Sequence, residues 1–106
     1  MIIESIDHLP VSYQKRAPGA IKRVERRLRE ELDRRPMMDR LAVSNTVSEL
    51  ADAETEWIRN RSQHGDLSME TYDKLSDFRT FVYLTALTEV VGPDRAHEVY
   101  TGEKPG

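Results

Sequence analysis

The longest run of apolar positions at helical spacing lies between Ser68 and Val91 and predicts an amphipathic helix. The Ser68 hydroxyl can cap the free amides of the first turn, and no Gly or Pro interrupts the run before Gly92 and Pro93, which can end it. From Phe81 onward the apolar positions widen around the helix, as in a helix that is buried on several sides. We therefore expect the rest of the chain to pack around this segment. Its main face carries Tyr72, Leu75, Phe78, Val82, Ala86 and Val90.

A β-strand over Thr80–Val91 is the competing interpretation of the same stretch, because it is rich in residues that favour strands. A strand of this kind needs a partner strand, and no other part of the sequence offers a clear one. We therefore adopt the helical interpretation.

Two further amphipathic helices are predicted before this segment and one after it. The first runs from Ala20 to about Leu32, and the second from about Met37 to Arg61. The short turn at Gln63–Asp66 makes the second helix and the Ser68–Val91 helix antiparallel neighbours, which is a helical hairpin. A short terminal helix is expected at Arg95–Tyr100, capped by Asp94.

The predicted fold class is all-α, with a long antiparallel helical hairpin, an N-terminal basic amphipathic helix and a short C-terminal helix. We expect an extended N-terminal arm over residues 1–18, a single helical domain over residues 19–100 and a flexible tail over residues 101–106. The arm is predicted to be extended because Pro10 and Pro18 disfavour a continuous helix. Its apolar residues can dock into a hydrophobic groove: Ile2, Ile3, Ile6, Leu9 and Val11.

The stripe of the second helix is a candidate surface for self-association or for a partner. Val43, Leu50 and Trp57 recur at intervals of seven residues, a spacing that suggests a seam against another long helix. Ordinary packing within one chain explains the same spacing equally well. The candidate surface comprises Val43, Val47, Leu50, Trp57 and Ile58.

The charge of the chain is distributed unevenly. The formal net charge is -3, yet ten Lys and Arg stand against five Asp and Glu between Lys15 and Arg40. One face or end of the folded protein should therefore be basic, and the remainder acidic.

Two interpretations of this basic segment stay open. In the first, it is a solvated face laced with ion pairs four residues apart, which use up much of the positive charge. These pairs would be Arg26–Glu30, Glu25–Arg29, Arg27–Glu31, Arg29–Asp33 and Glu30–Arg34. In the second, the helix contacts nucleic-acid phosphate. The candidates for that contact are Lys15, Arg16, Lys22, Arg23, Arg26 and Arg27, of which the first four lack a predicted carboxylate partner.

The sequence offers little that could support catalysis. The chain has no cysteine, which excludes disulfides, thiol chemistry and zinc–thiolate sites. His8, His64 and His97 are dispersed and lack the spacing of metal ligands. We expect no catalytic residues, no metal and no cofactor, and therefore no enzyme. No apolar run reaches the length of a membrane span, so we expect a cytoplasmic protein without a membrane partner.

Part of the chain, from Leu41 to Val99, resembles the helical core of tailed-phage terminase small subunits. The resemblance rests on the second helix, the Gly65-Asp66-Leu67 turn, the Tyr72–Val91 helix and the run Val91-Gly92-Pro93-Asp94-Arg95. It implies a non-enzymatic, ring-forming homo-oligomer in the host cytoplasm that brings viral DNA to the large packaging ATPase subunit. The chain departs from the family in lacking the N-terminal helix-turn-helix that many members use to bind DNA.

Two other roles fit the same features. A small helical inhibitor or regulator would bind a single protein partner, as an antitoxin-like or host-defence-blocking module does. A connector component of a virion would also be a small, self-associating helical protein.

Overall fold

The computed structural model of the chain describes residues 7, 9–61 and 68–103. The described residues form five helices and no strand: α1 (Val11–Arg34), α2 (Arg40–Ala53), α3 (Glu56–Arg61), α4 (Met69–Val91) and α5 (Pro93–Thr101). The all-α fold class predicted from the sequence is confirmed. The Thr80–Val91 stretch lies within α4, so the strand interpretation is wrong.

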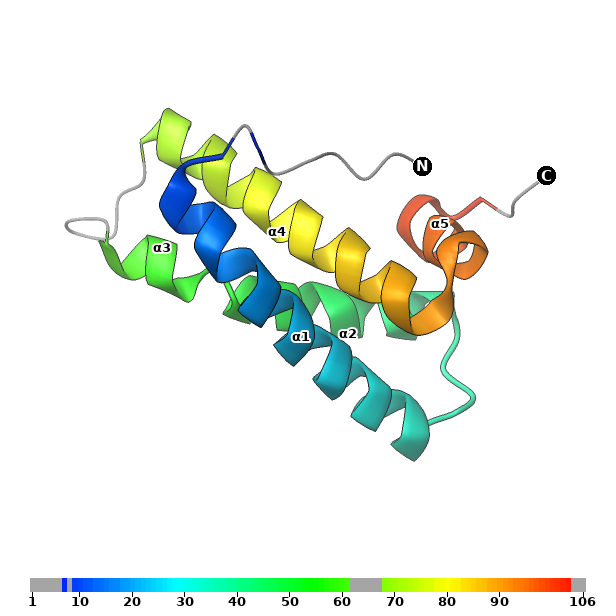
Figure 1. The fold of residues 1–106 in the computed structure, drawn as a ribbon. Coiled ribbons are helices and arrows are strands. Elements are labelled where there is room, and N and C mark those ends of the chain that lie inside the picture. Colours follow the sequence, from blue (N-terminus) through cyan, green and yellow to red (C-terminus); the bar gives the residue numbers. More distant parts are fainter. Residues whose placement is uncertain (1–6, 8, 62–67, 104–106) are drawn as a thin grey trace.

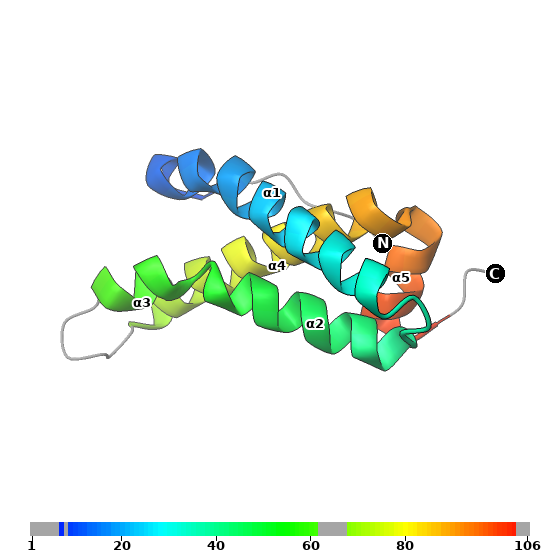
Figure 2. The same cartoon turned by 90° about the horizontal axis from the view of Figure 1, so that it is seen from below.

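Three long rods lie side by side in the structure (Figures 1 and 2). α1 and α4 run in the same direction, and α2 followed by α3 runs back against both. α2 and α4 are therefore the antiparallel neighbours of the predicted hairpin, with α1 packed alongside. α5 turns back at the end of α4 and packs against α4 and α2. The fold is thus a three-helix bundle with a short helix across one end.

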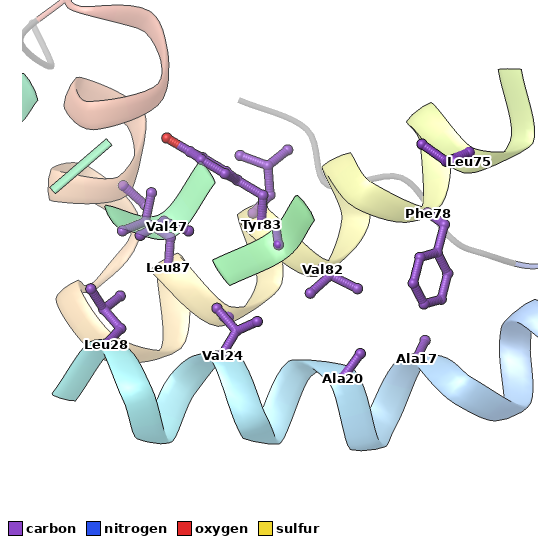
Figure 3. Close-up of a cluster of buried hydrophobic side chains, with 14 of the residues drawn as sticks. Ala17, Ala20, Val24, Leu28, Val47, Leu75, Phe78, Val82, Tyr83 and Leu87 are labelled. Carbon is purple, nitrogen blue, oxygen red and sulfur yellow. The ribbon is translucent and has the colours of Figure 1, made fainter. Parts of the chain in front are cut away.

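The core lies on α4, as the apolar pattern predicts. Figure 3 shows Phe78 pointing toward Ala17 of α1 and Val82 pointing toward Ala20. All four side chains are buried, and the small alanines let α1 approach α4 closely. Each fully buried Val or Phe stabilises the fold by roughly 1.5–3 kcal/mol, so Phe78 and Val82 both contribute substantially to the stability of the core.

The ends of α4 agree with the prediction. The Ser68 hydroxyl accepts a hydrogen bond from the backbone N–H of Thr71 at 3.1 Å. At the other end Gly92 has φ 87, and its N–H donates to the Thr88 carbonyl oxygen. A residue with a side chain rarely adopts such a positive φ, so glycine is the natural residue at this corner. α5 starts directly at Pro93.

The first helix starts well before the predicted Ala20, so the extended arm is wrong from Val11 onward. The Pro10 carbonyl oxygen accepts from the N–H groups of Tyr13 and Gln14 and starts the helix there. Pro18 lies inside α1 because the burial of Tyr13 and of Ala17 outweighs the cost of about 3 kcal/mol for an interior proline.

The remaining apolar residues of the predicted arm have different environments. Leu9 is buried in the core, while Val11 is exposed. Ile2, Ile3 and Ile6 lie outside the described residues.

The second helix is shorter than predicted and is broken. It starts at Arg40 with Asp39 as its N-cap, whose carboxylate accepts from the Ala42 N–H at 2.8 Å. It ends at Ala53, and a turn at Glu54 and Thr55 separates it from α3. Thr55 is fully buried and donates its hydroxyl and its N–H to the Asp52 carbonyl oxygen. Such local bonding competes with the helical pattern and causes the break.

The C-terminal end also differs in detail from the prediction. α5 begins at Pro93, so Asp94 lies in its first turn and Gly92 holds the cap position. Thr101 is the last residue of the helix, and Gly102 follows it in the left-handed conformation with φ 81. The rest of the predicted tail from residue 104, like the predicted turn at Gln63–Asp66, lies outside the described residues.

Replacing Phe78 with alanine tests the central position of the α1–α4 contact. Phe78 is fully buried and meets the rings of Tyr13 and Trp57 edge to face. We expect Phe78→Ala to lower the free energy of unfolding by about 3–5 kcal/mol in urea titrations. Tyr72→Ala, an exposed aromatic residue on the same helix, is the matched control and should change it by less than about 0.5 kcal/mol. Equal effects of the two variants would contradict this account of the core.

Candidate nucleic-acid interface on α1

The outer face of α1 is basic because its inner face is committed to the core. Buried residues recur along the inner face at helical spacing, which turns the residues between them toward solvent. All six cations predicted to contact phosphate are exposed on this helix. Between Lys15 and Arg27 the only acidic residue is Glu25, which is partly buried. The buried set comprises Tyr13, Ala17, Ala20, Val24 and Leu28.

Four cations along this face have no side-chain hydrogen bond or ion pair to any described residue: Lys15, Lys22, Arg26 and Arg29. We call them the outer row. Their successive spacings of seven, four and three residues place them on one side of the helix. At 1.5 Å of rise per residue the outer row spans roughly 21 Å. It is therefore a line of unneutralised positive charge that faces solvent.

Three other arginines lie beside the outer row and are already engaged: Arg16, Arg23 and Arg27. We call them the inner row. The Arg23 guanidinium donates to both carboxylate oxygens of Glu54, at 2.6 Å from Nη2 and at 3.1 and 3.0 Å from Nε. The hydrogen bonds that Arg23 donates to this carboxylate raise the pKa of Arg23 above its usual value. Arg16 lies over the ring of Trp57, with Cζ 4.3 Å from the ring centroid. Arg27 Nε approaches a Glu30 oxygen at 4.0 Å.

The five ion pairs predicted four residues apart do not form among the described residues of α1. Glu31 takes both Arg34 and Arg35 instead, the latter at 3.0 Å. Within the described part of the chain Lys15 and Lys22 have no carboxylate partner, whereas Arg23, which has no acid four residues away on the helix, does have one. The reason is that Glu54 reaches Arg23 from the α2–α3 turn, a contact between residues distant in sequence. Arg29 belongs to the outer row but is absent from the predicted phosphate contacts, because its spacing from Glu25 and Asp33 predicted ion pairs with them.

The predicted association surface is wrong for three of its five residues. Val43, Val47 and Ile58 are buried in the core of the single chain, while Leu50 and Trp57 are partly buried against it. The stripe is covered by the chain's own α1 and α4, so it is not available to a partner. Large apolar side chains are exposed elsewhere, at Val11, Met37, Leu41, Met69, Tyr72 and Tyr100.

A second polar feature lies between α2, α4 and α5. It is a pocket of about 180 Å³ lined by hydroxyl side chains and by Arg79. The hydroxyls of Ser44 and Tyr83 lie 3.2 Å apart, and Arg79 is paired with Asp52. These contacts join α2 to α4, and the rings of Tyr83 and Tyr100, with centroids 5.6 Å apart, join α4 to α5. The lining comprises Ser44, Ser48, Arg79, Thr80, Tyr83 and Tyr100.

Two searches over the described residues bear on other classes of site. No cluster of three or more His, Asp or Glu side chains there could hold a metal ion. None of the described helices is long and apolar enough to cross a membrane. His97 is partly buried on α5, and His8 and His64 lie outside the described residues.

Comparison of the chain with protein-family models, with curated proteins and with solved structures gives no match. The resemblance to terminase small subunits therefore rests only on the sequence features from which it was inferred. The charged face of α1 and the exposed apolar residues are the structural features from which a function can be inferred.

The Glu54 carboxylate provides a test of this charge arrangement. Glu54→Gln removes the acid that neutralises Arg23, so we expect tighter retention on immobilised heparin, with elution at higher salt. The ion pair is half exposed at Arg23, and its loss should cost only roughly 0.2–1 kcal/mol of stability. Glu103→Gln, which removes an exposed acid beyond α5, is the control and should elute at a lower salt concentration than Glu54→Gln. Identical elution of the two variants would contradict an attractive face on α1.

Proposed function

We propose that the protein is a non-enzymatic helical adaptor that binds the phosphate backbone of nucleic acid through the outer row of α1. The observation that carries this proposal is the set of four aligned cations without a carboxylate partner among the described residues. Lys and Arg that neutralise phosphates release condensed counterions, and this release drives binding. Binding by such a row is independent of base sequence.

The remainder of the chain supports one orientation of binding. The net charge of -3 together with the basic segment leaves the rest of the chain acidic, and α2, α4 and α5 each carry more acidic than basic residues. α4 carries exposed Glu70, Asp73 and Asp77, and α2 carries exposed Glu49. Acidic surfaces repel a polyanion, so among the described helices α1 attracts one most strongly. The protein would therefore approach nucleic acid with α1 foremost and with α4 and α5 facing away.

The resemblance to terminase small subunits adds a narrower proposal. In it the protein is a phage DNA-packaging adaptor that forms a homo-oligomer and contacts a large packaging ATPase subunit. The hairpin of α2 and α4 with a basic helix beside it supports this role. The interface would use two exposed apolar residues. Met37 lies in the turn before α2 and is 92% exposed, and Leu41 lies in the first turn of α2 and is 58% exposed.

The same two apolar residues also support the alternative roles. A large exposed apolar side chain is the usual anchor of a protein contact. An inhibitor or regulator that binds one partner, or a connector component of a virion, would use Met37 and Leu41 in the same way. These roles differ from the adaptor in having no need of the outer row, so DNA binding separates them.

The outer row is tested by removing two of its charges. We expect Lys22→Ala/Arg26→Ala to weaken binding to a fluorescent duplex in anisotropy titrations across a salt series. The slope of log affinity against log salt should become shallower by about 0.9 for each phosphate that the variant no longer neutralises. The control is Lys74→Ala/Arg95→Ala, which removes the same charge from α4 and α5, where both cations are ion-paired. Equal weakening in both double variants would show that net charge alone is responsible, and no binding by the unchanged protein would refute the proposal.

The role of Met37 and Leu41 in self-association is tested by native mass measurement with and without DNA. We expect a discrete oligomer for the unchanged protein and a monomer for Met37→Ser/Leu41→Ser, because the replacement removes apolar contact area without touching the core. Tyr100→Ser changes an exposed residue of α5 and should leave the oligomer intact. A monomeric unchanged protein would refute self-association.

A further inference from the structure

Trp57 and Arg16 form an unusual pair at the edge of the basic face. The Trp57 ring is held edge to face by Tyr13 at 5.0 Å and by Phe78 at 5.7 Å between centroids. Arg16 Cζ lies 4.3 Å from the centroid of the same ring. Two rings from the core therefore fix the indole, and the indole in turn positions the guanidinium.

The location of this pair distinguishes it from a purely structural contact. Arg16 is exposed and follows directly after Lys15, the first residue of the outer row. Trp57 is only partly buried, although the rings of Tyr13 and Phe78 behind it are buried. An arginine held over an aromatic ring can present the other side of its guanidinium to a further planar group. The planar groups that lie beside nucleic-acid phosphates are bases.

We infer that Arg16, supported by Trp57, is a stacking site for an unpaired nucleobase, so that the preferred ligand is single-stranded nucleic acid. The inference rests on the proposed function, because the outer row must first hold the phosphates. Bases of a single strand can splay out and stack on aromatic side chains or on arginine, whereas the faces of paired bases are covered by their neighbours. The outer row thus supplies affinity for any polyanion, and Arg16 supplies preference for the single strand.

Trp57 provides a direct readout, because it is the only tryptophan of the chain. We expect oligo-dT or oligo-U to change the Trp57 fluorescence as it binds, because a base stacks on the Arg16–Trp57 pair. A duplex of equal length, or heparin, should bind through the outer row and leave that fluorescence nearly constant. The unchanged, full-length chain is used for these titrations.

Arginine-to-lysine substitutions separate stacking from charge. Arg16→Lys keeps the positive charge but removes the planar guanidinium, so we expect roughly tenfold weaker binding to oligo-dT. Arg59→Lys is the matched control on α3, outside both rows, where Arg59 is exposed, and it should leave affinity close to that of the unchanged protein. Neither variant should weaken duplex binding, and both side chains are exposed, so both variants should fold.

The outcomes separate this inference from the proposed function. Equal affinity for duplex and single strand, without a fluorescence change, would overturn the stacking site and leave the phosphate-binding role in place. Equal effects of Arg16→Lys and Arg59→Lys on oligo-dT binding would overturn it as well. Failure of the unchanged protein to bind duplex, single strand and heparin alike would overturn both proposals. A single-strand preference that is lost in Arg16→Lys and kept in Arg59→Lys is the supporting result.

Discussion

The contact between α1 and α4 determines which way the charges of the protein point. Ala17 and Ala20 allow α1 to lie close against Phe78 and Val82, and this packing fixes the rotation of α1 about its own axis. A rotation of α1 by one residue, about 100°, would bury a charged side chain in place of Val24, either Arg23 or Glu25. The basic face is thus a consequence of core packing, since charged residues occupy the side of α1 that the core cannot use.

The same packing determines which cations remain available. Glu54 reaches Arg23 because the buried Thr55 ends α2 and places the α2–α3 turn beside α1. Trp57 follows in α3 and meets Arg16 and Tyr13. Arg16 and Arg23 are therefore held by α3 and its turn, while the outer row stays unpaired within the described part of the chain. The break between α2 and α3 thus helps to decide which arginines of α1 are engaged within the chain and which stay unpaired.

Sequence reasoning succeeded where the information is local and failed where it is not. α4 was predicted to within a residue because its cap, its apolar face and its terminating glycine all lie in one stretch. The early start of α1 was missed because Pro18 signals a break locally, and only the tertiary burial of Tyr13 outweighs that signal. The ion pairs failed for a related reason. Several carboxylates lie within reach of each arginine, and side-chain packing, not spacing, decides among them.

The failure of the predicted association surface shows what an apolar stripe can and cannot say. An apolar stripe such as Val43, Val47 and Ile58 has to be buried against something. The sequence pattern is the same whether it is buried by another helix of the chain or by a second copy. Once α1 and α4 supply the cover, that stripe can bind nothing else. Any partner must then be recognised by side chains that the bundle leaves exposed, among them the cations of α1 and the apolar pair Met37 and Leu41. These two features differ in chemistry, so a polyanion and a protein could occupy the molecule at the same time, which is the basic requirement of an adaptor.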